Sequence, residues 1–184
     1  VNAGEKVLLT GDSGSGKSTL FKLILGEEKA TRGEIEYFDE SGKVVKPDLA
    51  EIGYLPQSPV LFPATIAENI TMFNDKLEQF VSGAINDVQL ASDVSKFPDG
   101  IETEIDLNKL TVSGGQRQKI VLARSKVHDS KLILIDEGTS AIDQAATMRI
   151  LKRLVKTDAT IVFIAHNFND EMQKIFDHEI CLTR

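Results

Sequence analysis

Short apolar runs alternate along this chain with stretches of helical period. The apolar runs predict strands at 6–10, 34–38, 52–55, 132–135, 160–165 and 179–183. The runs at 132–135 and 161–165 are apolar at every position, which is typical of parallel strands that helices cover on both faces. The alternation therefore predicts an α/β fold with a largely parallel sheet.

A helical region interrupts this alternation between residues 75 and 127. The segment 75–86 has helical period, a turn follows at 97–100, and a second helix begins near Ser113. We therefore expect residues 1–74 and 128–184 to form the α/β core, and residues 75–127 to form a helical subdomain inserted between two of its strands.

The composition is that of an ordinary soluble domain. The 184 residues carry a net charge of −7, and no apolar run reaches the roughly 18 residues that span a bilayer. The scattered Lys and Arg residues form no evident basic face, so we expect no nucleic-acid partner. The single cysteine, Cys181, cannot form an internal disulfide, which suits a reducing cytosol, and its apolar neighbours predict a core position.

The sharpest local signal is the segment 11–18, which fits the phosphate-loop pattern G-x-x-x-x-G-K-[ST] between an apolar run and a helical stretch. Glycines permit a tight turn whose N–H groups converge on an anion, and the following helix adds the positive end of its dipole. Lys17 would contact the β- and γ-phosphates, and the Ser18 hydroxyl would bind Mg²⁺. The alternative, a glycine-rich turn without a ligand, leaves the Lys-Ser pair unexplained. The residues expected to bind nucleotide here are Gly11, Ser13, Gly14, Ser15, Gly16, Lys17, Ser18 and Thr19.

Polar residues also follow three other predicted strands, namely Gln57, the pair Asp136 and Glu137, and His166. Because ligands of α/β folds bind beyond the carboxyl ends of the strands, we expect these residues to share one site with the phosphate loop. Asp136 is suited to hold Mg²⁺, and Glu137 to orient or deprotonate a water molecule. His166 would contact the γ-phosphate. The structural alternatives are a strand-ending turn for the acidic pair, a structural or exposed histidine, and a polar loop glutamine.

A second helix start suited to anions is predicted at Ser113-Gly114-Gly115-Gln116. Ser followed three residues later by Gln is a capping box. The two glycines lower helix propensity, so a purely structural cap would gain nothing from them, whereas bare glycine N–H groups form an anion site. One nucleotide needs only one such helix start, unless two chains share it.

This ordered set of motifs resembles that of the ATP-binding-cassette (ABC) ATPases over nearly the whole chain. Segment 112–118 resembles the family's signature motif, and 135–143 resembles its Walker B strand and D-loop. Gln57 matches the Q-loop glutamine and His166 the switch histidine, while 61–70 resembles the stretch after the Q-loop in exporter-type members. The resemblance implies a P-loop NTPase core, ATP and Mg²⁺ as cofactors, Gln57 as a further Mg²⁺ ligand, and ATP hydrolysis.

The resemblance also implies partners. Two nucleotide-binding domains, identical or different, would pair head to tail, with each ATP between the phosphate loop of one and the signature helix of the other. Ser113 and Gly115 would contact the γ-phosphate of the partner's ATP, and Asp143 would couple the two sites. Closure would power export by a transmembrane domain outside this sequence, which places the domain, itself soluble, at the cytoplasmic face of the cell membrane.

The chain also departs from the family pattern. Val112 replaces the usual Leu, and Asp106-Leu107-Asn108-Lys109 stands where exporters carry Gly-Glu-x-Gly. The family's adenine-stacking aromatic residue lies upstream of this sequence, so we expect a fragment truncated at both ends, with weak selectivity for adenine. The alternatives are a soluble ABC ATPase acting on DNA or in translation, a regulatory module without turnover, and a small-molecule kinase, which leaves 113–116 unexplained.

Overall fold

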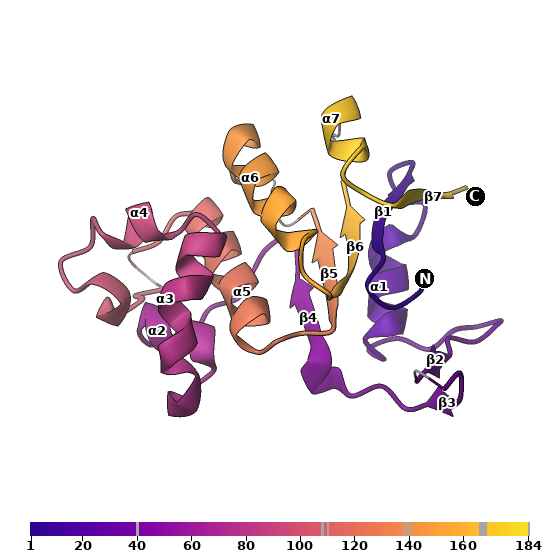
Figure 1. Ribbon diagram of the computed structural model, residues 1–184, viewed down its shortest axis with the longest axis horizontal. Coiled ribbons are helices and arrows are strands. Elements are labelled where there is room, and N and C mark those ends of the chain that lie inside the picture. Colours follow the sequence, from indigo (N-terminus) through magenta and orange to yellow (C-terminus); the bar gives the residue numbers. More distant parts are fainter. Residues whose placement is uncertain are drawn as a thin grey trace.

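The computed structural model describes residues 1–39, 41–107, 109, 111–137, 139, 141–165 and 169–183. Their centre is a five-stranded sheet in the order β4-β5-β6-β1-β7, in which every adjacent pair is parallel (Figure 1). A separate antiparallel pair is formed by β2 (Tyr37–Phe38) and β3 (Val44–Val45). The predicted α/β fold with a largely parallel sheet is therefore confirmed. The central strands are β1 (Lys6–Gly11), β4 (Ile52–Leu55), β5 (Leu132–Asp136), β6 (Thr160–Ile164) and β7 (His178–Leu182).

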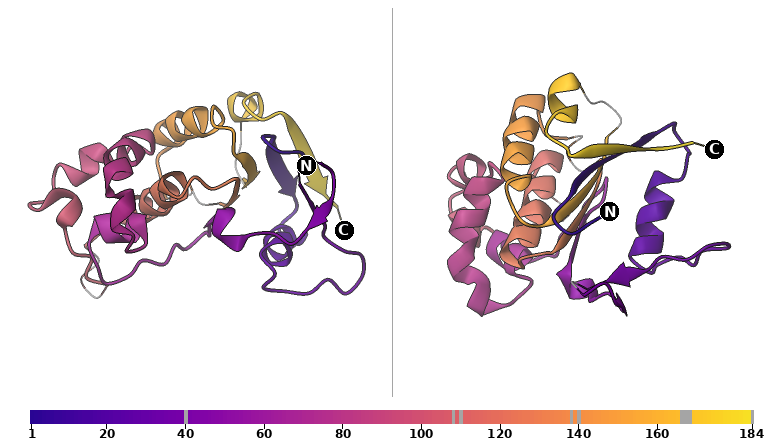
Figure 2. Two further views of the ribbon diagram at one scale, coloured as in Figure 1. Left: turned by 60° about the horizontal axis from the view of Figure 1, so that its bottom comes forward. Right: turned by 45° about the vertical axis from the view of Figure 1, so that its right-hand side comes forward.

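Helices cover both faces of the central sheet, as Figure 2 shows. On one face lies α1 (Lys17–Ile24), whose Phe21 packs in a cluster with Leu134. On the other face lie α5 (Gly114–Val127) and α6 (Gln144–Leu154), in a second cluster that includes Ile133. Neighbouring residues of a strand point to opposite faces, so an uninterrupted apolar run supplies both clusters. The prediction drawn from the apolar runs is therefore confirmed.

A group of shorter helices lies beyond β4, at the left of Figure 1. It contains α2 (Ile66–Thr71), α3 (Glu78–Asp87) and α4 (Ala91–Val94), and α5 joins it to the sheet because α5 packs on α2, on α3 and on β4. α2 lies before residue 75 but packs with this group. The division into a core of residues 1–74 and 128–184 and a helical subdomain of residues 75–127 stays a prediction. The remaining helical segments are α7 (Asp170–Gln173) and the 3₁₀ turns Leu49–Glu51, Asp75–Leu77 and Gly100–Glu102.

Two buried features fix the chain between β4 and α5. A Cβ at Gly53 would lie 2.4 Å from the Ser125 hydroxyl oxygen, so glycine permits the close approach of β4 to α5. The buried Asn69 side chain accepts a hydrogen bond from the Phe62 N–H at 2.8 Å and donates to the carbonyl oxygens of Phe62 and Thr65. The Arg124 Nε donates in turn to the Asn69 carbonyl oxygen at 2.8 Å. The segment that leads from β4 to α2 is thus held from within.

Three sequence predictions require correction. The strand expected at 34–38 is limited to Tyr37–Phe38, and the helix expected at 75–86 begins as a 3₁₀ turn before α3. The core position predicted for Cys181 is wrong, because Cys181 is exposed on β7, which pairs only with β1 at the edge of the sheet. Within the described ranges, no helix combines the length and the apolar character that crossing a bilayer requires.

Candidate nucleotide site

The carboxyl ends of β1, β4, β5 and β6 lie at one edge of the sheet, because these strands are parallel neighbours. The segments that leave these ends include residues 11–18 after β1, Gln57 after β4, and Glu137 after β5. The structure thus brings the phosphate loop, Gln57 and the acidic pair to the same edge. His166 follows β6 in the sequence and lies outside the described residues.

The phosphate loop turns on glycines with left-handed backbone angles. Gly11, Gly14 and Gly16 have φ angles of 136°, 76° and 99°. A Cβ at Gly11 would lie 2.4 Å from the Leu182 carbonyl oxygen, so the neighbouring strand excludes any side chain there. Gly16 is the N-cap of α1 and leaves the first turn of that helix without a side-chain cap. The N–H groups of this turn are therefore not engaged by a capping side chain.

Lys17 and Ser15 hold polar groups inside this loop. The Lys17 side chain is folded over the loop, and its Nζ donates to the carbonyl oxygens of Gly11 at 2.7 Å and Asp12 at 2.9 Å. Lys17 is only 6% exposed, while Ser18 and Thr19 are exposed. The Ser15 hydroxyl oxygen is buried and has no hydrogen-bond partner among the described residues, an arrangement that is unfavourable until a partner arrives. A buried ammonium, an unpartnered hydroxyl and an uncapped helix start together suit a bound anion.

Asp136 and Glu137 occupy different positions at the end of β5. Asp136 is the last residue of the strand and is buried, whereas Glu137 follows it with a φ of 51° and donates its N–H to the Ile164 carbonyl oxygen at 3.1 Å. The Gln57 Nε2 donates to the Glu137 Oε2 at 3.1 Å. The structure therefore joins the two side chains directly, although 80 residues separate them in the chain.

Asp136 contributes to the raised pKa of Tyr54 on the neighbouring strand β4. Burial raises the pKa of Tyr54, and the negative charges of Asp136 and Glu27 raise it further. No group of three or more His, Cys, Asp or Glu side chains that could hold a metal ion occurs in the described ranges. The oxygen donors at this edge that could hold a magnesium ion are the Asp136 carboxylate, the Ser18 hydroxyl and the Gln57 amide oxygen.

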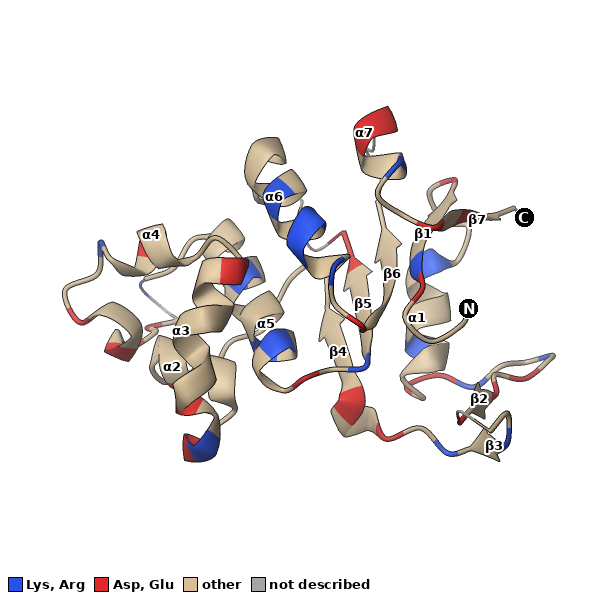
Figure 3. Cartoon of the chain, in the orientation of Figure 1, with Lys and Arg blue, Asp and Glu red and all other residues tan. Residues whose placement is uncertain are grey.

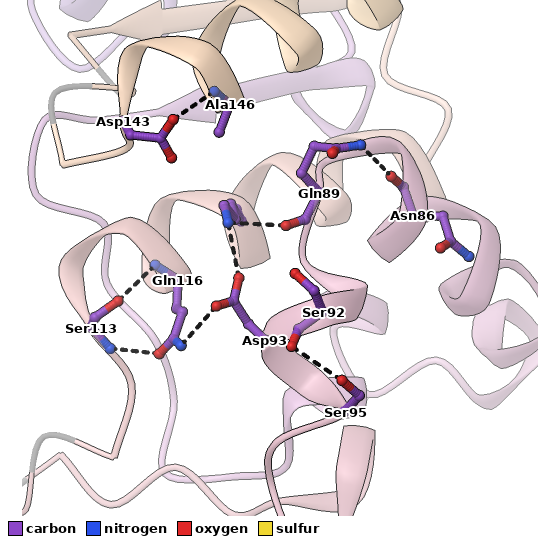
Figure 4. Close-up of polar contacts among 10 residues, drawn as sticks. Asn86, Gln89, Ser92, Asp93, Ser95, Ser113, Gln116, Asp143 and Ala146 are labelled. Carbon is purple, nitrogen blue, oxygen red and sulfur yellow. Dashed lines mark hydrogen bonds and ion pairs between the residues drawn. The ribbon is translucent and has the colours of Figure 1, made fainter.

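The second predicted helix start is confirmed as the beginning of α5. The Ser113 hydroxyl accepts from the Gln116 N–H at 3.2 Å, and the Gln116 Oε1 accepts from the Ser113 N–H at 2.8 Å. These reciprocal bonds form the capping box that the sequence predicted, and Figure 4 shows them at the start of the helix.

The glycines of this helix start have a steric role that the sequence analysis missed. A Cβ at Gly115 would lie 2.6 Å from the Ala141 carbonyl oxygen, and one at Gly114 would lie 3.3 Å from the Ala141 Cβ. The Gln118 Oε1 also accepts from the Ala141 N–H at 3.2 Å. The expectation that a structural cap gains nothing from glycine is therefore wrong, because α5 begins in contact with the segment that follows β5.

The two anion-suited helix starts lie apart within one chain. α5 packs on β4, whereas the phosphate loop follows β1, which is three strand spacings away, or about 14 Å. The helices α1 and α5 also cover opposite faces of the sheet. Asp143, the other residue expected at a shared site, is the N-cap of α6, and its Oδ1 accepts from the Ala146 N–H at 2.8 Å.

A parallel sheet that carries this loop before α1 defines the chain as a phosphate-loop α/β domain. Residues 1–140 match the family described as "ABC transporter". Since this match covers most of the chain, the chain belongs to the ABC transporter family. The resemblance inferred from the motifs is confirmed.

Relatives and a solved structure agree with this assignment. The transport/processing ATP-binding protein ComA of Streptococcus pneumoniae is 35% identical over 170 residues, which cover 90% of this chain and 24% of that protein. The ATP-dependent permease MDL1 of Candida albicans is 34% identical over 181 residues, 92% of this chain and 26% of the permease. A bacterial Atm1-family ABC exporter with ATP bound matches the whole chain over 32% of its own length, with a TM-score of 0.84 and 30% identity. The chain spans about a quarter of the length of the curated relatives it matches.

Proposed function

We propose that the chain binds and hydrolyses ATP with Mg²⁺ as one of two paired nucleotide-binding domains of an exporter. The observation that carries this proposal is the meeting of the phosphate loop, Asp136 and the Gln57–Glu137 contact at one edge of the sheet. This combination offers an anion site, a buried carboxylate suited to a metal ion, and a carboxylate placed to act on a water molecule.

Each part of the site has a distinct chemical role in this proposal. Lys17 and the Ser15 hydroxyl supply donors to the phosphates, in place of the loop carbonyls that Lys17 now contacts. Ser18, Gln57 and Asp136 supply oxygen ligands for Mg²⁺, which neutralises phosphate charge when bound. Glu137 orients or deprotonates the attacking water. His166 would contact the γ-phosphate, as the family resemblance implies.

The separation of the two helix starts supports a site shared between two chains. The segment Ser113, Gly114, Gly115 and Gln116 would bind ATP held by the phosphate loop of a partner domain, because α5 and α1, the helices that these two helix starts begin, cover opposite faces of the sheet. Such an interface is twofold symmetric when the partner is a second copy. Asp143 lies two residues after Ala141, whose carbonyl oxygen approaches Gly115. In this proposal Asp143 would couple the two sites.

An apolar surface after Gln57 supports a membrane-domain partner. The rings of Phe62 and Phe73 contact edge to face at 5.9 Å between centroids. Both residues are nevertheless exposed, Phe73 by 55%, and so is Met72, the residue before Phe73. Exposed clusters of this kind mark interaction surfaces. The relatives named as transport proteins and a permease favour export over a soluble ATPase. A membrane partner would place this domain at the cytoplasmic face of a membrane.

The proposal is tested by light scattering of the Glu137→Gln chain, in which ATP is bound but turned over about 10² to 10⁴ times more slowly. We expect the mass to double with Mg-ATP and to stay that of a monomer without it. The double variant Lys17→Ala, Glu137→Gln is the control and should remain monomeric. A Glu137→Gln chain that stays monomeric at saturating Mg-ATP, or that hydrolyses ATP at the wild-type rate, would overturn the proposal.

A further inference from the structure

A single carboxylate on α4 receives two side chains from the start of α5 (Figure 4). The Lys119 Nζ lies 2.9 Å from the Asp93 Oδ2, and the Gln116 Nε2 donates to the Asp93 Oδ1 at 3.4 Å. The Lys119 Nζ also donates to the Gln89 carbonyl oxygen at 2.9 Å. Asp93 thus ties the first turns of α5 to α4, and Lys119 also ties them to the loop before α4.

The contact with Gln116 reaches the capping box itself. The amide of Gln116 accepts the Ser113 N–H through Oε1 and donates to Asp93 through Nε2. Because the two atoms belong to one planar amide, a rotation that breaks the contact with Asp93 also moves the oxygen that caps Ser113. The orientation of the cap is therefore fixed from outside the helix.

The surroundings of Asp93 keep this contact charged. The side chains of Lys119 and Asp93 are only 13% and 20% exposed, so water screens the pair less than it screens a surface pair. Burial opposes ionisation of Asp93, but the hydrogen bonds from Lys119 and Gln116 and the charges of Lys119 and Lys96 outweigh it and hold the pKa of Asp93 below its usual value. Gln89 has a φ of 58°, an uncommon backbone angle at a residue whose carbonyl oxygen receives Lys119.

We propose that Asp93 is a positioning residue for the signature segment, which it holds through Gln116 and Lys119 in the orientation that receives the partner's ATP. The inference rests on the proposed function, since that function gives the segment 113–116 its ligand. Asp93 would act on closure of the pair, and it would leave the binding of ATP to the chain's own phosphate loop unchanged.

The same helix offers a matched control. Near its other end, the Lys126 Nζ lies 2.7 Å from the Asp87 Oδ2, so this ion pair also joins α5 to the helical group. Figure 3 shows basic positions on α5 and acidic positions on α3 and α4. Asp87→Ala removes the same chemical group as Asp93→Ala but lies away from Ser113, because Lys126 is ten residues after Gln116 on the helix.

The experiment measures the Mg-ATP concentration that gives half-maximal dimer formation in the Glu137→Gln chain. We expect Asp93→Ala to raise it about tenfold, Asp93→Asn to raise it less because an acceptor for Gln116 remains, and Asp87→Ala to change it less than twofold. Binding of a fluorescent ATP analogue to the monomer should be the same in all variants. Equal shifts for Asp93→Ala and Asp87→Ala would overturn the inference, because a general loss of stability would then explain both.

A second measurement separates this inference from the proposed function. If the Glu137→Gln chain does not dimerise with Mg-ATP, the proposed function fails, and the positioning role is judged by amide hydrogen exchange without nucleotide. The N–H groups of Gln116 and Arg117 are bonded to the Ser113 hydroxyl and carbonyl oxygens, so they report on the cap. Asp93→Ala should speed their exchange about tenfold and Asp87→Ala should not. Unchanged exchange in Asp93→Ala would overturn the positioning role.

Discussion

A methyl group added at Gly115 tests whether the start of α5 is held against the segment after β5. The new Cβ of Gly115→Ala would lie 2.6 Å from the Ala141 carbonyl oxygen, whereas such atoms usually stay at least about 3.3 Å apart. The backbones must separate by roughly 0.7 Å, and overpacking of this kind costs about 1 to 3 kcal/mol. The higher helix propensity of alanine returns at most about 1 kcal/mol. With the full gain in propensity, we expect a net destabilisation of about 0 to 2 kcal/mol.

Two other helical glycines separate the steric effect from helix propensity. Gly83 lies inside α3, and outside its own helix turn no atom of the described residues lies within 4 Å of an added Cβ, so Gly83→Ala should stabilise the chain by about 0.5 to 1 kcal/mol. A Cβ at Gly114 meets the Ala141 Cβ at 3.3 Å, a milder approach than the one at Gly115, so Gly114→Ala should lie between the other two variants. Urea unfolding measures all three, and a common m-value would show that the variants differ in stability alone.

The order of the three variants carries the result. If Gly115→Ala were as stable as Gly83→Ala, the approach of Ala141 would place no constraint on position 115. The glycine would then serve an anion alone, as the sequence analysis first supposed. If Gly115→Ala is destabilised as expected, the packing against Ala141 constrains position 115. A loss of ATP-dependent dimerisation in this variant would then reflect this packing as well as any lost contact with ATP.

Two further predictions follow from buried contacts. Asn69→Ala leaves the Phe62 N–H and three carbonyl oxygens without the partner they have now, so it should cost about 2 to 4 kcal/mol in urea unfolding; a loss below 1 kcal/mol would contradict this. The lowered pKa of Asp93 means that its contribution to the free energy of unfolding is present above about pH 4 and is lost as the pH falls through the folded pKa. The stability difference between the wild type and Asp93→Asn should therefore shrink below pH 4, and a difference that grows there would refute the assignment.

The features that the sequence predicted correctly are those set by neighbouring residues. The run 132–135 is apolar at every position and became a strand covered on both faces, because strand residues alternate between faces. Ser113 and Gln116 formed a capping box because that motif needs only the spacing of three residues. The placement of Gln57 and Glu137 at one edge also followed, once the strands were taken as parallel.

The features that the sequence did not predict depend on which distant segments meet. Apolar neighbours placed Cys181 in the core, but only the strand order shows that β7 lies at the sheet edge. The approach of Gly115 to Ala141 and the contact of Lys119 with Asp93 join residues 26 positions apart, and no local pattern specifies either partner. Such contacts are decided by packing. For this reason helix propensity alone gave the wrong account of the glycines at 114 and 115.

These distant contacts give the chain a physical link between its own site and the segment proposed to receive the partner's ATP. Ala141 lies four residues after Glu137, and its backbone contacts Gly115 and bonds to Gln118. The Ala141 carbonyl oxygen lies so close to Gly115 that no side chain fits between the two backbones. Asp93 restrains the other side of the same helix start through Gln116. Under the proposed function, the signature segment is therefore held on one side by Ala141, which follows the hydrolytic site of its own chain, and on the other side by α4.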